Sequence, residues 1–131
     1  MLEFLQPGGW APPIGYANGI AATGRQIHVG GQIGWNAQQQ FESDDLVDQV
    51  RQTLENIVAV VQAGGGSSDR IVSLTWYVTD IEDYLANAKM IGAAYRDVLG
   101  RHFPAMALVQ VTRLVEPRAK VEIQAVAVVE D

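Results

Sequence analysis

The chain contains no cysteine. This absence excludes a disulfide framework, a thiolate nucleophile and any metal site with cysteine ligands, and it is compatible with a reducing cytoplasm. Only two histidines occur, His28 and His102, and neither belongs to a recognisable catalytic pattern, so both are predicted to be structural. There is also no phosphate-binding loop, nucleophile elbow or metal-ligand cluster. The sequence therefore predicts neither a metal nor an organic cofactor.

Basic residues are scarce. Nine Lys and Arg oppose fifteen Asp and Glu, which gives a net charge of -6. We expect no nucleic-acid partner on this balance, because such binding relies on basic side chains that neutralise phosphates. Apolar runs fall far short of the ~20 residues of a membrane helix. The start, "MLEFLQPGGW", lacks the basic and apolar regions of a signal peptide. We expect a cytoplasmic protein with no membrane partner.

Hydrophobic residues make up 48% of the 131 positions, enough for the packed core of one domain over 1–131. Two segments have the spacing of amphipathic helices, 44–63 and 81–99. Asp44 and Asp45 begin the first, where the helix dipole favours acidic side chains, and Asp80 is the predicted N-cap of the second. The predicted buried residues are Leu46, Val50, Leu54, Ile57, Val58 and Val61 in the first helix and Leu85, Ala88, Ile91, Tyr95 and Val98 in the second.

The clearest strand is 70–80, "RIVSLTWYVTD", in which apolar and polar residues alternate. Its predicted inward residues are Val72, Leu74, Trp76 and Val78. Residues 1–18, rich in glycine and proline, predict an irregular arm that ends in a short strand. The remaining strands are predicted at 17–22, 26–31, 107–113 and 120–129.

This order, β-β-α-β-α-β-β, predicts an α+β fold of two layers, with two helices on one face of a mixed sheet. The last strand, "KVEIQAVAVVE", is apolar on both faces beyond Gln124. The helices cover only one face of the sheet, so the apolar second face predicts self-association. The alternative is that strand edges and the N-terminal arm cover it.

Two residues are open to more than one interpretation. Glu122 lies in a strand between Val121 and Ile123. Its carboxylate either points to water, which the pattern alone favours, or lies in a cleft where it can act as an acid or base. Tyr16, in "PPIGYANG", is either a pocket phenol or an ordinary loop aromatic.

Five segments in order resemble the Rid family (reactive intermediate deaminases), also called YjgF or L-PSP. The resemblance spans nearly the whole chain. Its segments are "PPIGYANGI", "IHVGGQIG", "VRQTLENIVAVVQAGGGSSDRIVSLTWYVTDIEDY", "FPAMALVQVTRL" and "AKVEIQAVAV". The resemblance implies a chorismate-mutase-like fold and a homotrimer with a central barrel and small-molecule clefts between subunits. Catalytic members hydrolyse enamines and imines derived from amino acids to ammonia and a 2-keto acid.

The resemblance also implies roles for individual residues. Tyr16 matches the pocket tyrosine of the family, and Gly31 matches the glycine whose backbone lines the pocket. Glu122 matches the glutamate that positions the attacking water. On this basis Glu122 and Tyr16 are the predicted catalytic residues.

The remaining pocket positions depart from the family pattern. Gly30 replaces a serine, Leu108 a frequent cysteine, and Met106 the arginine that forks onto the substrate carboxylate. A bidentate Arg–carboxylate contact contributes roughly 1.5–3 kcal/mol, so its loss weakens an anionic ligand about tenfold to a hundredfold. These three residues, with Gly31 and Trp35, are the predicted substrate contacts of a more apolar pocket. A neighbouring subunit could supply Arg113, Arg118 or Lys120 as a substitute cation.

Three functions follow from these observations. The first is an imine or enamine deaminase acting on a less anionic or bulkier substrate. The second, motivated by the missing arginine, is a non-catalytic trimer that binds a small molecule or regulates. The third, suggested by the older name of the family, is an endoribonuclease, against which the acidic balance argues.

Overall fold

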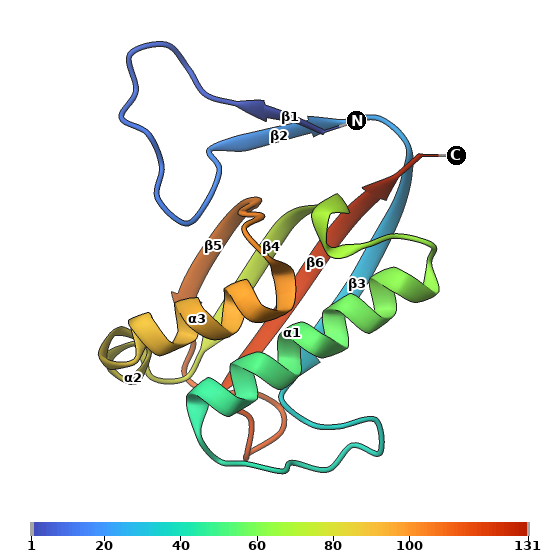
Figure 1. The fold of residues 1–131 in the computed structure, drawn as a ribbon. Helices are drawn as coiled ribbons and strands as arrows, with labels where there is room; N and C mark the ends of the chain where they lie inside the picture. Colours follow the sequence, from blue (N-terminus) through green and yellow to red (C-terminus); the bar gives the residue numbers. More distant parts are fainter. Residues whose placement is uncertain (1, 131) are drawn as a thin grey trace.

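The structure, a computed structural model, describes residues 2–130 and has the two layers expected from the sequence. The helices α1 (Leu46–Ala63), α2 (Ile81–Ala86) and α3 (Ala88–Leu99) accompany a four-stranded mixed sheet. Figure 1 shows α1 and α3 on the same face of this sheet. The sheet consists of β3 (Arg25–Ile33), β6 (Val121–Val129), β4 (Ile71–Val78) and β5 (Ala105–Gln110), in that spatial order.

The N-terminal arm is more regular than its composition indicates. Strands β1 (Leu2–Leu5) and β2 (Gly19–Ala22) pair antiparallel and form a separate two-stranded sheet. In Figure 1 this hairpin projects beyond the end of the main sheet. The prediction of an irregular arm over 1–18 is therefore wrong for its first residues, because β1 is stabilised by pairing with a strand further along the chain.

The second predicted helix is interrupted. Asp80 caps α2 as expected, since its side chain accepts hydrogen bonds from the backbone N–H groups of the first turn. The amide of Asn87 turns back to the carbonyl of Asp83 at 2.8 Å and separates α2 from α3. This break changes the rotation of the helix, so Leu85 and Ala88 are exposed rather than buried. The buried residues of α3 are Ile91, Ala94, Tyr95 and Leu99.

A similar shift occurs in β4. The register of β4 against β6 is irregular between Ile71 and Ser73, and Val72 occupies the extra position. As a result Ile71, not the predicted Val72, is fully buried in the core. The other predicted inward residues of β4 are confirmed, and they share one buried core with the apolar face of α1, which lies over β3 and β6. The largest fully buried apolar side chains are Leu54, Ile57, Val50, Val61, Ile71, Leu74, Val78, Val121 and Ile123.

A short 3-10 helix, η1 (Ser68–Arg70), connects α1 to β4. Within residues 2–130, no helix has an apolar stretch long enough to cross a membrane.

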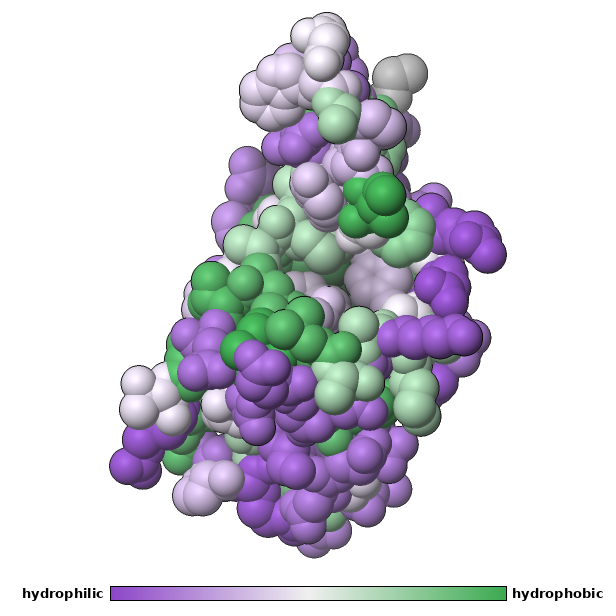
Figure 2. Space-filling model, turned by 90° about the vertical axis from the view of Figure 1, so that its left-hand side faces the viewer, coloured by the Kyte–Doolittle hydropathy of each residue, from purple (hydrophilic) through white to green (hydrophobic). Residues whose placement is uncertain are grey.

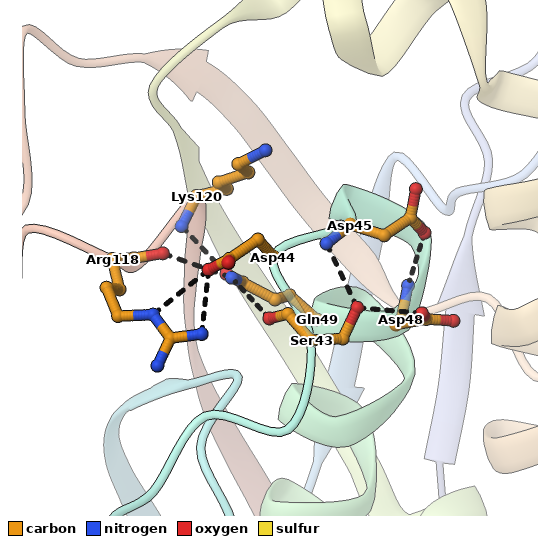
Figure 3. Close-up of polar contacts among 7 residues, drawn as sticks. All are labelled: Ser43, Asp44, Asp45, Asp48, Gln49, Arg118 and Lys120. Carbon is orange, nitrogen blue, oxygen red and sulfur yellow. Dashed lines mark hydrogen bonds and ion pairs between the residues drawn. The ribbon is translucent and has the colours of Figure 1, made fainter.

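The start of α1 is tied to the start of β6 by a buried amide (Figure 3). Gln49 is 1% exposed, and its Nε2 donates to the backbone carbonyls of Ser43 and Arg118 at 3.1 and 3.0 Å. Its Oε1 accepts from the backbone N–H of Lys120 at 2.8 Å. Beside it, the Arg118 guanidinium bonds Asp44. This junction positions the chain two residues before Glu122.

Candidate functional site

A distortion in β3 places two predicted pocket residues. The register of β3 against β6 is irregular between Val29 and Gln32, where Gly30 and Gly31 lie. A Cβ at Gly31 would collide with the Glu122 carboxylate, whereas a Cβ at Gly30 would meet no atom within 4 Å. The carboxylate of Glu122 therefore lies directly against the backbone of Gly31, and only glycine permits this approach.

Glu122 points away from the helices. Its neighbours Val121 and Ile123 are fully buried on the helix-covered face, so the side chain of Glu122 extends from the open face of the sheet. There it lines a hollow of about 280 Å³ together with Tyr77 and Arg113. Neither Glu122 nor Arg113 makes a side-chain hydrogen bond or ion pair within the described residues. We call this region, with Gly31, the Glu122 hollow.

Met106 and Leu108 line a different space. They pair with Leu74 and Trp76 of β4 and face the helices rather than the open side. Here β5, the α2–α3 segment and the arm around Ile14 enclose a cavity of about 460 Å³, which we call the Met106 cavity. Figure 2 shows hydrophobic side chains gathered around a hollow on this side of the molecule, below the N-terminal arm.

Aromatic rings form much of the wall of the Met106 cavity. Tyr95 stacks on Phe103 with ring centroids 5.3 Å apart, and Trp76 lies 6.4 Å from both Tyr95 and Tyr84. The Tyr95 hydroxyl donates to the His102 carbonyl at 2.6 Å. Burial raises the pKa of both Tyr84 and Tyr95 above the ordinary tyrosine value. The two tyrosines therefore stay uncharged, and the aromatic part of the wall is apolar.

Tyr16 lies beside this cavity. The following residue, Ala17, bridges to Ala105 at the start of β5, and its N–H donates to the Pro104 carbonyl at 3.0 Å. The preceding residues of the arm line the cavity, while Tyr16 itself is 44% exposed. The arm thus brings Tyr16 to the same end of β5 as Met106.

Trp35 is not brought to either space. Its ring lies 5.9 Å from Phe41, and its carbonyl accepts from Asn56 at 2.8 Å. His28 pairs with the Gln26 side chain at 2.8 Å. The His102 ring lies 2.7 Å from the Ile71 carbonyl, to which its Nε2–H donates. Within one chain these three residues have structural contacts.

The predicted site residues therefore form two separate groups. Glu122 and Met106 lie on opposite faces of the sheet, with β4 between their strands. Strands two apart are separated by roughly 10 Å. The structure joins Gly31 with Glu122 and Met106 with Leu108, but it does not bring the two groups together in one chain.

Several residues of these spaces were missed from the sequence. Arg96 and Arg101 line the Met106 cavity, although no pattern in the sequence predicts them there. Arg113, which the sequence offered only as a cation from a neighbouring subunit, lines the Glu122 hollow of its own chain. Trp76 and Tyr95 were assigned only to the core. In α3 the useful signal was the spacing of Arg96 from Gly92, which places both on one helix face.

No group of three or more acidic, histidine or cysteine side chains within residues 2–130 is arranged to hold a metal ion.

Comparison with known proteins identifies the class. A family model described as endoribonuclease L-PSP matches residues 10–129. A RutC family protein of Pyrococcus horikoshii is 36% identical over 116 residues, 88% of each chain. The 2-iminobutanoate/2-iminopropanoate deaminase of Salmonella typhimurium is 34% identical over 116 residues, 86% of each chain.

Solved structures agree. The Rid protein YyfB of Yersinia pestis superposes with a TM-score of 0.86 at 27% identity over 98% of both chains. Escherichia coli TdcF with bound serine gives a TM-score of 0.70 at 33% identity, covering 95% of this chain and 93% of that one. The fold is that of the L-PSP proteins. The chain belongs to this family, also known as the Rid or YjgF family, as its segments indicated.

Proposed function

We propose that the chain is an imine or enamine deaminase, which adds water across a C=N bond and releases ammonia and a carbonyl compound. Relatives at about 34% identity bear the name of an imine deaminase. The observation that carries the proposal is the contact between Gly31 and Glu122, where a carboxylate is held against exposed backbone. The proposed pocket differs from the family pattern at Met106, which replaces an arginine and makes the pocket more apolar.

The chemistry assigns a role to each group. Glu122 accepts a proton from the attacking water as hydroxide adds to the imine carbon, and it passes that proton to the nitrogen, which becomes an amine. When this adduct collapses, Glu122 takes the proton of the hydroxyl group and passes it to the amine, the C–N bond breaks, and C=O and ammonia are left. The Gly31 backbone holds the imine nitrogen, and the Tyr16 hydroxyl hydrogen-bonds the substrate. Gly30, Met106 and Leu108 supply the surrounding contacts, whereas Trp35, which lies in neither space, is left out of the site.

We further propose that the site is completed between subunits of a homotrimer. Two observations support this: the Glu122 hollow and the Met106 cavity cannot share a substrate within one chain, and the open sheet face bears the partly exposed apolar side chains of Val109 and Val126. Each cleft would join the Glu122 hollow of one subunit to the Met106 cavity of its neighbour. Sedimentation should give three times the 14.2 kDa chain mass, and a monomer would contradict the proposal.

Glu122→Gln tests the catalytic role. Removing a positioned general base lowers turnover by about 10²–10⁴-fold, which ammonia release from a freshly generated 2-imino acid would report. Glu55→Gln is the matched control, because Glu55 is an exposed carboxylate on α1 away from both groups. Unchanged turnover in Glu122→Gln would remove Glu122 from the mechanism.

A mixing experiment tests the shared cleft. Glu122→Gln and Met106→Glu should each be inactive alone, the second because its carboxylate repels an anionic substrate. In trimers co-expressed at equal amounts, about one quarter of the clefts would combine an intact Glu122 with an intact Met106 from different chains. Recovery of about that share of wild-type activity is the expected result. No recovery would show that each site lies within a single chain.

A non-catalytic binding trimer is the second candidate. It is favoured by Met106, which offers no charge at the position of the anion anchor. This alternative predicts a ligand that raises the melting temperature without being turned over. The endoribonuclease hypothesis is supported only by the family description. The net charge of -6 argues against it, because an acidic chain repels RNA phosphates. RNA cleavage by the pure protein, lost in Glu122→Gln, would reverse that judgement.

A further inference from the structure

We propose that the Met106 cavity binds a carboxylate with an aromatic body, and that Arg96 and Arg101 hold its anionic end. This inference rests on the proposed function and names its substrate class as 2-imino acids with aromatic side chains. The anion anchor absent at position 106 would then be supplied by α3 and the segment that follows it, rather than by β5. The ligand would be held with its ring among the aromatic residues and its charge at the rim.

The distribution of arginine partners supports the assignment. Within the described residues, three of the seven arginines make no hydrogen bond or ion pair, and two of these three, Arg96 and Arg101, line the Met106 cavity. No acidic side chain lines it. In a chain of net charge -6, two unpaired cations beside one apolar cavity favour an anionic ligand. The four arginines with a polar partner are Arg25, Arg51, Arg70 and Arg118.

Gly92 explains how Arg96 reaches the cavity. Glycine inside a helix is unfavourable by roughly 1 kcal/mol relative to alanine. At this position a Cβ would lie only 3.3 Å from Nη1 of Arg96, four residues later on α3. The absence of a side chain thus lets the guanidinium lie back along the helix beside the cavity, which Gly92 itself also lines.

The apolar part of the cavity suits an aromatic ring. Its volume of about 460 Å³ is within the range of small-molecule pockets. Met106 and Leu108 form a flexible floor, and Tyr84, Tyr95 and Phe103 offer faces and edges for ring stacking.

Binding of an unreactive probe tests the proposal without requiring catalysis. Titration calorimetry of the whole protein would compare 3-phenylpropanoate, its uncharged analogue 3-phenylpropan-1-ol, and acetate. We expect the phenylpropanoate to bind at least tenfold more tightly than either, because each of the other two lacks one half of the recognition. Equal affinity for the acid and the alcohol would overturn the role of the arginines.

Variants locate the anion. Arg96→Gln and Arg101→Gln should each weaken phenylpropanoate several-fold, and together about tenfold, without affecting the alcohol. Arg51→Gln, which loses only an exposed ion pair with Asp97, is the matched control. Arg113→Gln tests the rival cation in the Glu122 hollow. A loss of affinity confined to Arg113→Gln would overturn the assignment to Arg96 and Arg101.

Gly92→Ala separates a binding role from a structural one. Alanine should raise the melting temperature through its helix propensity, while it displaces Arg96 and weakens phenylpropanoate several-fold. Higher stability together with weaker affinity would support the proposal, and unchanged affinity would contradict it.

Glu122→Gln should still bind phenylpropanoate. Loss of turnover with retained binding in this variant would support the assignment of the cavity. In the wild type, turnover of an imine without binding of phenylpropanoate would overturn the assignment of the cavity and leave the deaminase proposal intact.

Discussion

The Glu122 hollow and the Met106 cavity differ in how their shapes arise. In the hollow, a backbone distortion at Gly30 and Gly31 brings the main chain against one carboxylate, so the arrangement depends on the absence of a side chain at Gly31. In the cavity, side chains from two layers and the arm make the surface, and several of them could change without disturbing the sheet. The comparison indicates that the reaction and the choice of substrate depend on different parts of this fold.

The largest expected effect breaks the first half of this comparison. Gly31→Ala forces the Glu122 carboxylate away from the backbone and should lower turnover at least about a hundredfold, within the range for a displaced catalytic group. Binding of phenylpropanoate in the Met106 cavity should be unchanged. Gly8→Ala, at an exposed position with nothing within 4 Å, controls for replacing glycine. Full turnover in Gly31→Ala would show that the contact is not needed.

The next largest effect is expected from a change in the Met106 cavity. Met106→Arg restores a guanidinium on β5 and should increase turnover of small anionic 2-imino acids about tenfold to a hundredfold. The same change fills the cavity and should weaken the aromatic probe. Parallel steady-state kinetics and calorimetry would check both directions. If the wild type already processes small imino acids at the rate of the variant, Arg113 or another cation is sufficient.

A third experiment loosens the support beneath Glu122. Gln49→Leu keeps the side-chain volume but leaves the Lys120 N–H and the Ser43 and Arg118 carbonyls without their partner. We expect the free energy of unfolding to fall by roughly 1–3 kcal/mol, measured by urea denaturation. Gln62→Leu, on the exposed side of α1, should have little effect. Equal stability of the two variants would show that the junction is not structurally important.

The smallest effect concerns the wall of the Met106 cavity at high pH. Burial raises the pKa of Tyr95 in the folded state, whereas the unfolded tyrosine ionises near pH 10. Stability from this group is therefore complete below pH 10 and declines above it, by up to about 1.4 kcal/mol per pH unit. Tyr95→Phe should lose about 1 kcal/mol at neutral pH, through the bond to His102, and show a shallower alkaline decline. An identical alkaline slope would contradict the assignment.

The sequence predicted those features of the fold that depend on the spacing of apolar residues and on helix capping. The α+β order, the stripe on α1 and the Asp80 cap were all readable, because spacing and cap chemistry act within a few residues. The break at Asn87 was not, since a single asparagine that bonds back to Asp83 interrupts a pattern that continues on both sides. The strand β1 was missed for the opposite reason, because its partner is distant in sequence.

The candidate site followed the same division. Segment resemblance selected Gly31 and Glu122, which the structure places in contact, although their catalytic roles remain a prediction. It could not show that Met106 faces the helices, because that depends on the register of β5 against β4. The positions of Arg96 and Arg101 could not be predicted, because the cavity they line forms only where the arm, α3 and β5 meet.

The position of β6 also affects how the chain can fold as it is made. This strand is the last in the sequence, yet it lies between β3 and β4 and pairs with both, from Arg25 opposite Val129 to Val78 opposite Val121. Until β6 emerges from the ribosome, β3 has no neighbour in the main sheet. Such distant pairings slow folding and leave strand edges open to other chains during synthesis. The nascent chain therefore cannot complete the main sheet until β6 has been synthesised.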